Sequence, residues 1–309
     1  MKDKINKILV VIIFILLLSL VLKKSYFLFP QVNYLYLNKV RILDLIEQKN
    51  LHFFRYMVVY LPIFMSNILK VNVDFIYTIY LYIIGACLIC FSYKIYIFKN
   101  KRIKLLTYVY ILFFYTLIYF VVNGRIIFAY LGEVFLILEI YSKKNRKSIY
   151  FLSIFLSSIS SGTMLVIIFT IILYTLNKLK VKEILTKKSI LIIPIFFVIV
   201  IYSKKMIEKN LNFFEGSLIK MLSHGIFSSK DLNLTLIISC VYLLIVLILG
   251  VLLKVKQDII KSMIFISLIF GLFGKTTFLM CLIPVFFEIG FFINKIVFLK
   301  RGKNVKSDD

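Results

Sequence analysis

The chain has 309 residues, 61% of them hydrophobic, and its mean hydropathy is +0.98. No water-soluble domain of this length has such a composition, which excludes soluble enzymes and indicates a protein that crosses a membrane many times. The net charge of +25 comes from lysines in short clusters between apolar runs, so we expect membrane lipids and not nucleic acid as the charged partner.

Apolar runs long enough to cross a hydrocarbon core of ~30 Å predict about ten membrane helices. In chain order they cover residues 8–22, 75–97, 105–122, 126–141, 149–176, 190–202, 234–253, 263–273 and 276–299. We read the first as an uncleaved signal anchor. The predicted fold is therefore all-α and polytopic, with residues 1–309 forming a single membrane domain.

The run at residues 149–176 is too long for one ordinary crossing, and S-S-I-S-S-G-T interrupts it. We expect a hairpin of two short helices meeting at 160–162, each of roughly a dozen residues and ~18 Å. Such helices occur where protein or a water-filled cavity surrounds them. The alternative is one long tilted helix with a kink at Gly162.

Lysine and arginine gather in alternate loops, which places both termini in the cytoplasm. Two longer segments then face outward, at residues 23–74 and 204–233. Residues 53–69 of the first are apolar but short and contain Pro62 and Asn67, so we expect an interfacial or re-entrant helix.

The stretch YFVVNGRIIFAYLGEVF places Arg125 at an outer turn, after Asn123 and Gly124. An arginine at this depth is either an interfacial side chain that reaches toward water or a functional group. Glu133 lies two helical turns further on. We expect it to pair with Arg125, and the alternative is that it handles protons.

Two other cations resemble Arg125 in their setting. Lys275 lies at an outer turn in FGLFGKTTFLMCLIP, and Arg55 begins the interfacial helix in HFFRYMVVYLP. Isolated outward cations in aromatic surroundings suit a lipid-linked phosphate or pyrophosphate, which they bind by charge-assisted hydrogen bonds. For Lys275 the alternative is an ordinary surface lysine.

Two stretches, NGRIIFAYLGEVFLILEIYSKKNRKSIYFLSIFLSSISSGTMLVIIF and GKTTFLMCLIPVFFEIG, resemble the Wzy-type polysaccharide polymerases, particularly the EpsG branch. In that family an arginine leads a span that precedes a basic loop and a short hairpin, often with a histidine at its tip. This chain departs from the pattern in two places: residues 160–163 have no histidine, and Lys275 replaces an arginine.

The resemblance implies an enzyme of the bacterial cytoplasmic membrane. It would bind an undecaprenyl-pyrophosphate-linked glycan on the outer face and transfer the glycan to another lipid-linked unit, with other polysaccharide-assembly proteins as partners and with no cofactor or metal. Arg125 would hold the pyrophosphate, assisted by Lys275 and Arg55, with hydroxyls from Ser161 and Thr163. His224 or Glu215 would be the catalytic base.

Three other functions stay open. A membrane-embedded glycosyltransferase would use an acidic pair in its first outer loop, for which Asp44 and Glu47 are available. A flippase or transporter of lipid-linked glycan would use the same cations and broken helices. The third is a non-catalytic assembly partner.

Overall fold

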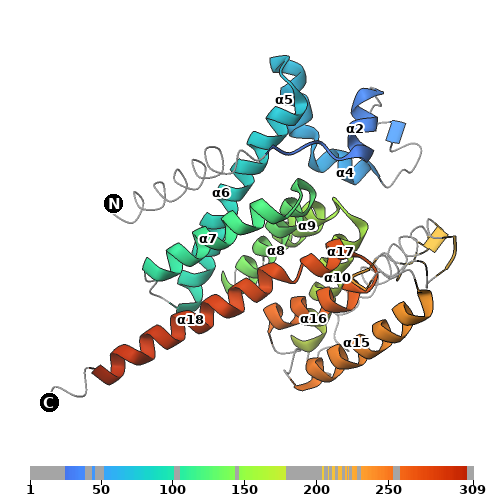
Figure 1. Cartoon of the computed structure of the whole chain (residues 1–309). Coiled ribbons are helices and arrows are strands. Elements are labelled where there is room, and N and C mark those ends of the chain that lie inside the picture. The colour runs from blue at the N-terminus through green and yellow to red at the C-terminus, as the bar shows by residue number, and fades with distance from the viewer. Residues whose placement is uncertain are drawn as a thin grey trace, which may run out of the picture. The chain divides into compact units, whose positions relative to one another are not determined.

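The structure is a computed structural model of the whole chain. It describes residues 25–38, 44–45, 52–100, 105–142, 146–178, 204, 208, 211–212, 215–217, 220, 222, 225–227, 231–252 and 258–304. The regular elements in this part are all helices, labelled in Figure 1, which confirms the expected all-α class. The predicted runs at 8–22 and 190–202 lie outside the described residues.

Three of the described helices are long and apolar enough to cross a membrane: Val73–Lys99, Asn233–Leu252 and Lys275–Lys295. Shorter apolar helices cover Tyr60–Leu69, Leu106–Val121, Ser148–Ser157, Ser161–Thr175 and Ile259–Gly271. These helices support a membrane protein. The expected number of about ten spans and the cytoplasmic termini stay predictions.

The residues form two compact units. Unit 1 comprises residues 1–160 and 286–309, and unit 2 comprises residues 161–285. The expectation of a single membrane domain stays a prediction.

Helix α8 (Gly124–Ser142) is the central helix of unit 1, between α6 (Val73–Asn100) and α9 (Lys147–Ser157). Nearly every side chain in its first four turns is buried. A Cβ atom at Gly132 would lie 2.7 Å from the Ser153 carbonyl oxygen of α9. Glycine is therefore needed here, because only a small residue lets the two backbones approach this closely.

Residues 25–29 are hydrogen-bonded to α6 and α7 (Leu105–Val121) of the same unit. The Tyr26 hydroxyl donates to the Tyr119 carbonyl at 2.6 Å, near the end of α7. The Leu28 amide donates to the Asp74 carboxylate at 2.7 Å, in the first turn of α6. Figure 1 shows α2 (Pro30–Leu37) with the next two helices at this end of α6.

The expected interfacial helix at 53–69 is two helices, α4 (His52–Val58) and α5 (Tyr60–Leu69). Pro62 is the third residue of α5. A proline ring clashes with the carbonyl four residues earlier, here residue 58, and it has no N–H to donate. The single expected helix is therefore wrong, and Pro62 accounts for the break.

The last expected span, 276–299, is broken in the same way. Helix α17 (Lys275–Leu279) ends before a turn at Met280, and α18 (Leu282–Asn304) follows. Pro284 is the third residue of α18, and the carbonyl that its ring excludes belongs to Met280. The expected span is thus supported by the candidate span Lys275–Lys295, and Pro284 accounts for the turn at 280–281 within it.

Unit 2 is built around α10 (Ser161–Lys178), which packs against α16 (Ile259–Gly271) and α17. The turn at 158–160 confirms that the run 149–176 is interrupted, and excludes one continuous helix. However, α10 has 18 residues and is ~27 Å long, so it is not the half-helix that we expected. The hairpin arrangement stays a prediction.

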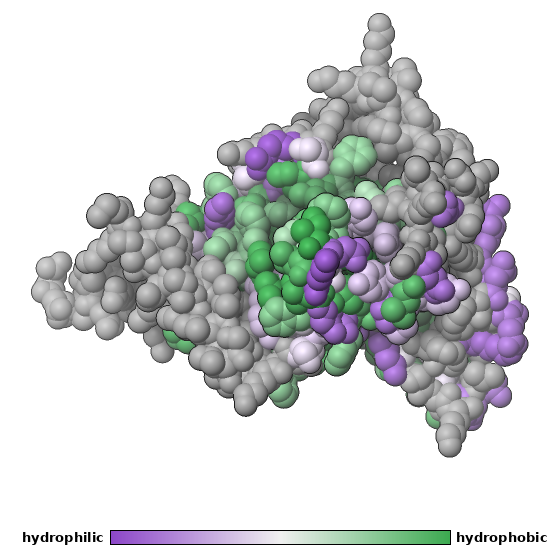
Figure 2. Space-filling model, turned by 90° about the horizontal axis from the view of Figure 1, so that it is seen from above, coloured by the Kyte–Doolittle hydropathy of each residue, from purple (hydrophilic) through white to green (hydrophobic). Residues whose placement is uncertain are grey.

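Hydrophobic side chains also cover much of the described surface, as Figure 2 shows for one face. The extreme case is α15 (Leu232–Leu252) of unit 2, whose apolar window is only 17% buried by protein. A helix that is apolar all round and uncovered by protein is stable only in lipid. This exposure supports a membrane location.

Candidate functional site: an arginine at the start of the central helix

Gly124 brings the start of α8 close to α6. A Cβ atom at this position would lie 2.5 Å from Leu81 Cδ1 and 3.2 Å from the Tyr77 hydroxyl oxygen. The glycine therefore removes the side chain that would hold the two helices apart. As a result Arg125, the next residue, begins α8 beside the buried face of α6.

Arg125 is half-buried and only partly hydrogen-bonded. Its Nη2 donates to Ser160 Oγ at 2.9 Å, whereas its buried Nε has no hydrogen-bond partner. The buried Tyr77 hydroxyl also has no partner, and it interacts electrostatically with the guanidinium. A buried polar group left unpaired costs about 1–3 kcal/mol, so these two groups would gain from an acceptor oxygen placed between them.

The contacts of Arg125 argue against a simple interfacial arginine. It lies beside Tyr77, a completely buried residue in the second turn of α6. Arg125 is also fixed by Ser160, at the turn that follows α9. A side chain that only reaches toward water would extend freely and would need neither burial nor a fixed partner.

Glu133 does not pair with Arg125, so the predicted ion pair is wrong. The Glu133 side chain has no exposed surface, and neither carboxyl oxygen has a hydrogen-bond partner. The two residues are eight positions apart, about 12 Å along α8, which is too far for direct contact. Ser160, and not Glu133, is the observed hydrogen-bond partner of Arg125.

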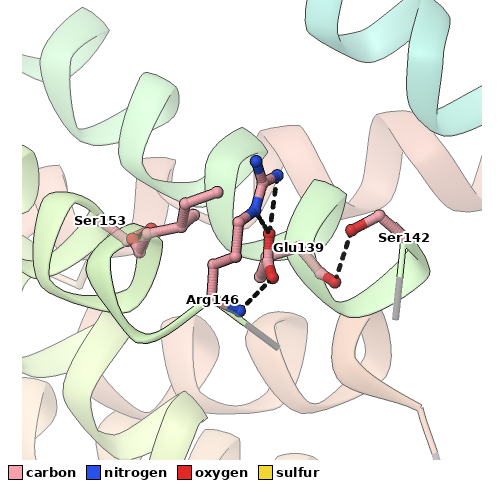
Figure 3. A network of polar contacts seen from close by, with 5 residues as sticks. Glu139, Ser142, Arg146 and Ser153 are labelled. Atoms are coloured by element: carbon pink, nitrogen blue, oxygen red, sulfur yellow. Dashed lines mark hydrogen bonds and ion pairs between the residues drawn. The ribbon is translucent and has the colours of Figure 1, made fainter. Parts of the chain in front are cut away.

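An ion pair that we did not predict closes the other end of α8 (Figure 3). The Arg146 side chain folds back over Glu139, donating to one carboxylate oxygen from Nε and Nη2 at 3.2 Å each, and its backbone amide donates to the other. Glu139 is completely buried, whereas the Arg146 side chain is 51% exposed. The sequence signal for this pair was an acidic residue, Glu139, in an apolar run seven residues before Arg146 in a basic loop.

Lys275 is exposed at the start of α17 in unit 2. The Thr277 hydroxyl donates to the Phe270 carbonyl at 2.7 Å and to the Gly274 carbonyl, so it holds the turn together. A Cβ atom at Gly162 would clash with the Thr277 side chain, which shows how closely α10 approaches α17. Unit 2 thus brings Lys275 near the start of α10.

The other expected contacts with substrate differ in exposure. Ser161 is half-buried in the first turn of α10, and Thr163 is buried. Arg55 is half-buried on α4, a helix that contacts α9 within unit 1. Asp44, which belongs to the transferase alternative, is half-buried, whereas Glu47 lies outside the described residues.

Of the two expected bases, Glu215 is exposed and forms an ion pair with Lys220. The hydrogen bond and positive charge of Lys220 lower the pKa of the Glu215 carboxyl. A lower pKa makes the carboxylate a weaker base. His224 lies outside the described residues, so its role stays a prediction.

Within the described part of the chain, no group of three His, Cys, Asp or Glu side chains could hold a metal ion. No family model, curated protein or solved structure matches the chain.

Proposed function

We propose that this protein polymerises lipid-linked oligosaccharide units on the outer face of a bacterial cytoplasmic membrane, with an undecaprenyl-pyrophosphate-linked glycan as substrate. The observation that carries the proposal is the incompletely paired Arg125 beside Tyr77. Both groups can donate hydrogen bonds, and one of them is cationic. A phosphate oxygen would satisfy both at once.

The depth of this cluster also fits a lipid-linked substrate. A pyrophosphate joined to a polyprenyl chain lies where the headgroup region meets the hydrocarbon core. Arg125 lies beside the second turn of a candidate span, at a comparable level. A soluble sugar nucleotide would not need an anion-binding group at this depth.

In the proposed reaction an acceptor hydroxyl oxygen forms a bond with the anomeric carbon of the donor glycan. The bond from that carbon to the pyrophosphate oxygen breaks, and the lipid pyrophosphate leaves with the electron pair. Arg125 stabilises the negative charge that develops on the leaving group, assisted by Lys275. The proton of the acceptor hydroxyl passes to a base, for which His224 is better suited than Glu215, whose pKa Lys220 lowers.

The test uses the purified chain in proteoliposomes supplied with lipid-linked oligosaccharide, with polymer length and rate as the measured quantities. Removing one donor that stabilises developing charge costs about 100-fold in rate, and we expect this loss for Arg125→Ala. Arg125→Lys keeps the charge but loses the fork of donors, so it should recover only part of the rate. Lys94→Ala, which removes an exposed cation from α6, is the matched control.

Unchanged polymer length in Arg125→Ala would overturn the proposal. Loss of activity with Asp44→Asn or Glu47→Gln, but not with Arg125→Ala, would favour the membrane-embedded glycosyltransferase. The confirmed interruption between α9 and α10 keeps a flippase as a second candidate. Wild-type protein that moves lipid-linked glycan across the bilayer without lengthening it would establish that function instead.

A further inference from the structure

Glu133 is a buried acid to which the proposed glycan chemistry gives no role. Its carboxyl group has no exposed surface, and both oxygens lack a hydrogen-bond partner in the described part of the chain. The ion pairs found there join other residues: Arg146 with Glu139, Lys204 with Glu208, and Lys220 with Glu215. Among the described residues, Glu133 thus has no counter-charge for its burial.

The polar groups that the structure places near Glu133 are hydroxyls. From α7, the Tyr115 hydroxyl interacts electrostatically with the carboxyl group, and it shares a hydrogen bond of 2.5 Å with Ser92 Oγ of α6. From α9, Ser153 and Ser157 approach the neighbouring Gly132. Hydroxyl groups of this kind can accept or relay a proton, but they do not neutralise a carboxylate.

An ionised carboxylate in such a site would carry the full cost of burying an unpaired charge. A neutral carboxylic acid avoids most of this cost, because the proton removes the charge. Glu139, on the same helix, shows the other solution: it is equally buried, and it receives three hydrogen bonds from Arg146. The two acids therefore differ in what compensates their burial.

We propose that Glu133 is a proton-binding site inside unit 1, which holds a proton at neutral pH and releases it only to water that reaches the carboxyl group. On release, the carboxyl O–H bond breaks, the carboxylate keeps the electron pair, and a water molecule accepts the proton. This role is independent of the proposed function, since it concerns neither Arg125 nor the glycan.

The first experiment is infrared spectroscopy of the purified full chain at neutral pH. We expect the wild type to show the carbonyl stretching band of a protonated carboxylic acid. The band should disappear in Glu133→Gln, which keeps the shape of the side chain, and should persist in Glu139→Gln. An unchanged band in a folded Glu133→Gln variant, or its absence from the wild type, would overturn the proposal.

A second measurement needs no variant, so it decides the question even if Glu133→Gln does not fold. A hydrophobic carbodiimide reacts with protonated carboxyl groups within membranes, and mass spectrometry locates the product. We expect Glu133 to be labelled about tenfold more than Glu139, whose carboxylate accepts three hydrogen bonds from Arg146. Equal labelling, or labelling of Glu139 alone, would contradict the proposal. Neither measurement depends on polymer formation, so failure of one proposal is distinguishable from failure of the other.

Discussion

The two ends of α8 each have an arginine, but the arginines have different environments. Arg146 gives all its observed side-chain hydrogen bonds to one buried carboxylate, and in return it neutralises Glu139. Arg125 has one serine partner, and its Nε remains unpaired beside an unpaired tyrosine hydroxyl. The buried carboxylate of Glu139 is thus fully hydrogen-bonded within the protein. The buried Nε of Arg125 would need an additional acceptor to be hydrogen-bonded. On this difference rests our proposal that Arg125, and not Arg146, is the functional arginine.

The largest effect on stability should come from Arg146→Ala. The variant removes the counter-charge of Glu139 and leaves the backbone amide of residue 146 as its hydrogen-bond donor. After discounting for the half-exposed arginine we expect a loss of about 2 kcal/mol in unfolding free energy. Chemical denaturation in detergent would measure it, with Lys94→Ala as the control. A loss no larger than that of the control would mean that the pair does not stabilise this end of α8.

A smaller loss is expected for Gly124→Ala at the opposite end. The added methyl group meets Leu81 Cδ1, the far end of a flexible side chain, so we expect about 1 kcal/mol of destabilisation. The same change moves Arg125 away from Tyr77, so polymer formation should also fall. Normal activity in this variant would show that the close approach of α8 to α6 is not needed.

Tyr77→Phe should not destabilise the protein, in contrast to the two changes above. It removes an unpaired buried hydroxyl, so unfolding free energy should stay constant or rise by about 0.5 kcal/mol. Polymerisation should slow, because one donor to the proposed phosphate is lost. A marked loss of stability would indicate that the hydroxyl has a structural partner, which would weaken the comparison between the two ends.

The smallest effect on stability is expected for the exposed ion pair between Glu215 and Lys220. This pair serves as a solvent-exposed comparison for the buried Glu139. Lys220 lowers the pKa of Glu215 below its ordinary value of 4.5. The pair's contribution to stability is therefore fully present above pH 4.5 and is lost as the pH falls through the lowered pKa. In Lys220→Ala the pKa of Glu215 should return toward 4.5, which a carboxyl NMR titration would detect. An unchanged titration would show that the pair does not form in solution.

The sequence by itself determined the helical class, the approximate position of most described helices and the break near residue 160. Backbone N–H and C=O groups must be hydrogen-bonded inside a lipid bilayer, so long apolar runs are expected to form helices. It also identified Arg125 as unusual, because a cation between two apolar runs needs a reason. The breaks before Pro62 and Pro284 could have been predicted from the proline ring, but hydrophobicity alone does not locate them.

Only the tertiary structure decided which groups meet. The expected partner of Arg125 was Glu133, on its own helix, whereas the observed partner is Ser160, 35 residues away. Glu139 and Arg146 were not singled out, because a sequence of this kind contains many acids near basic loops. Pairing depends on which helices pack together and on what fits between them, as at Gly124 and Gly132. Those contacts are set by three-dimensional packing. Composition and hydrophobic periodicity therefore do not predict that Arg125 is left incompletely hydrogen-bonded.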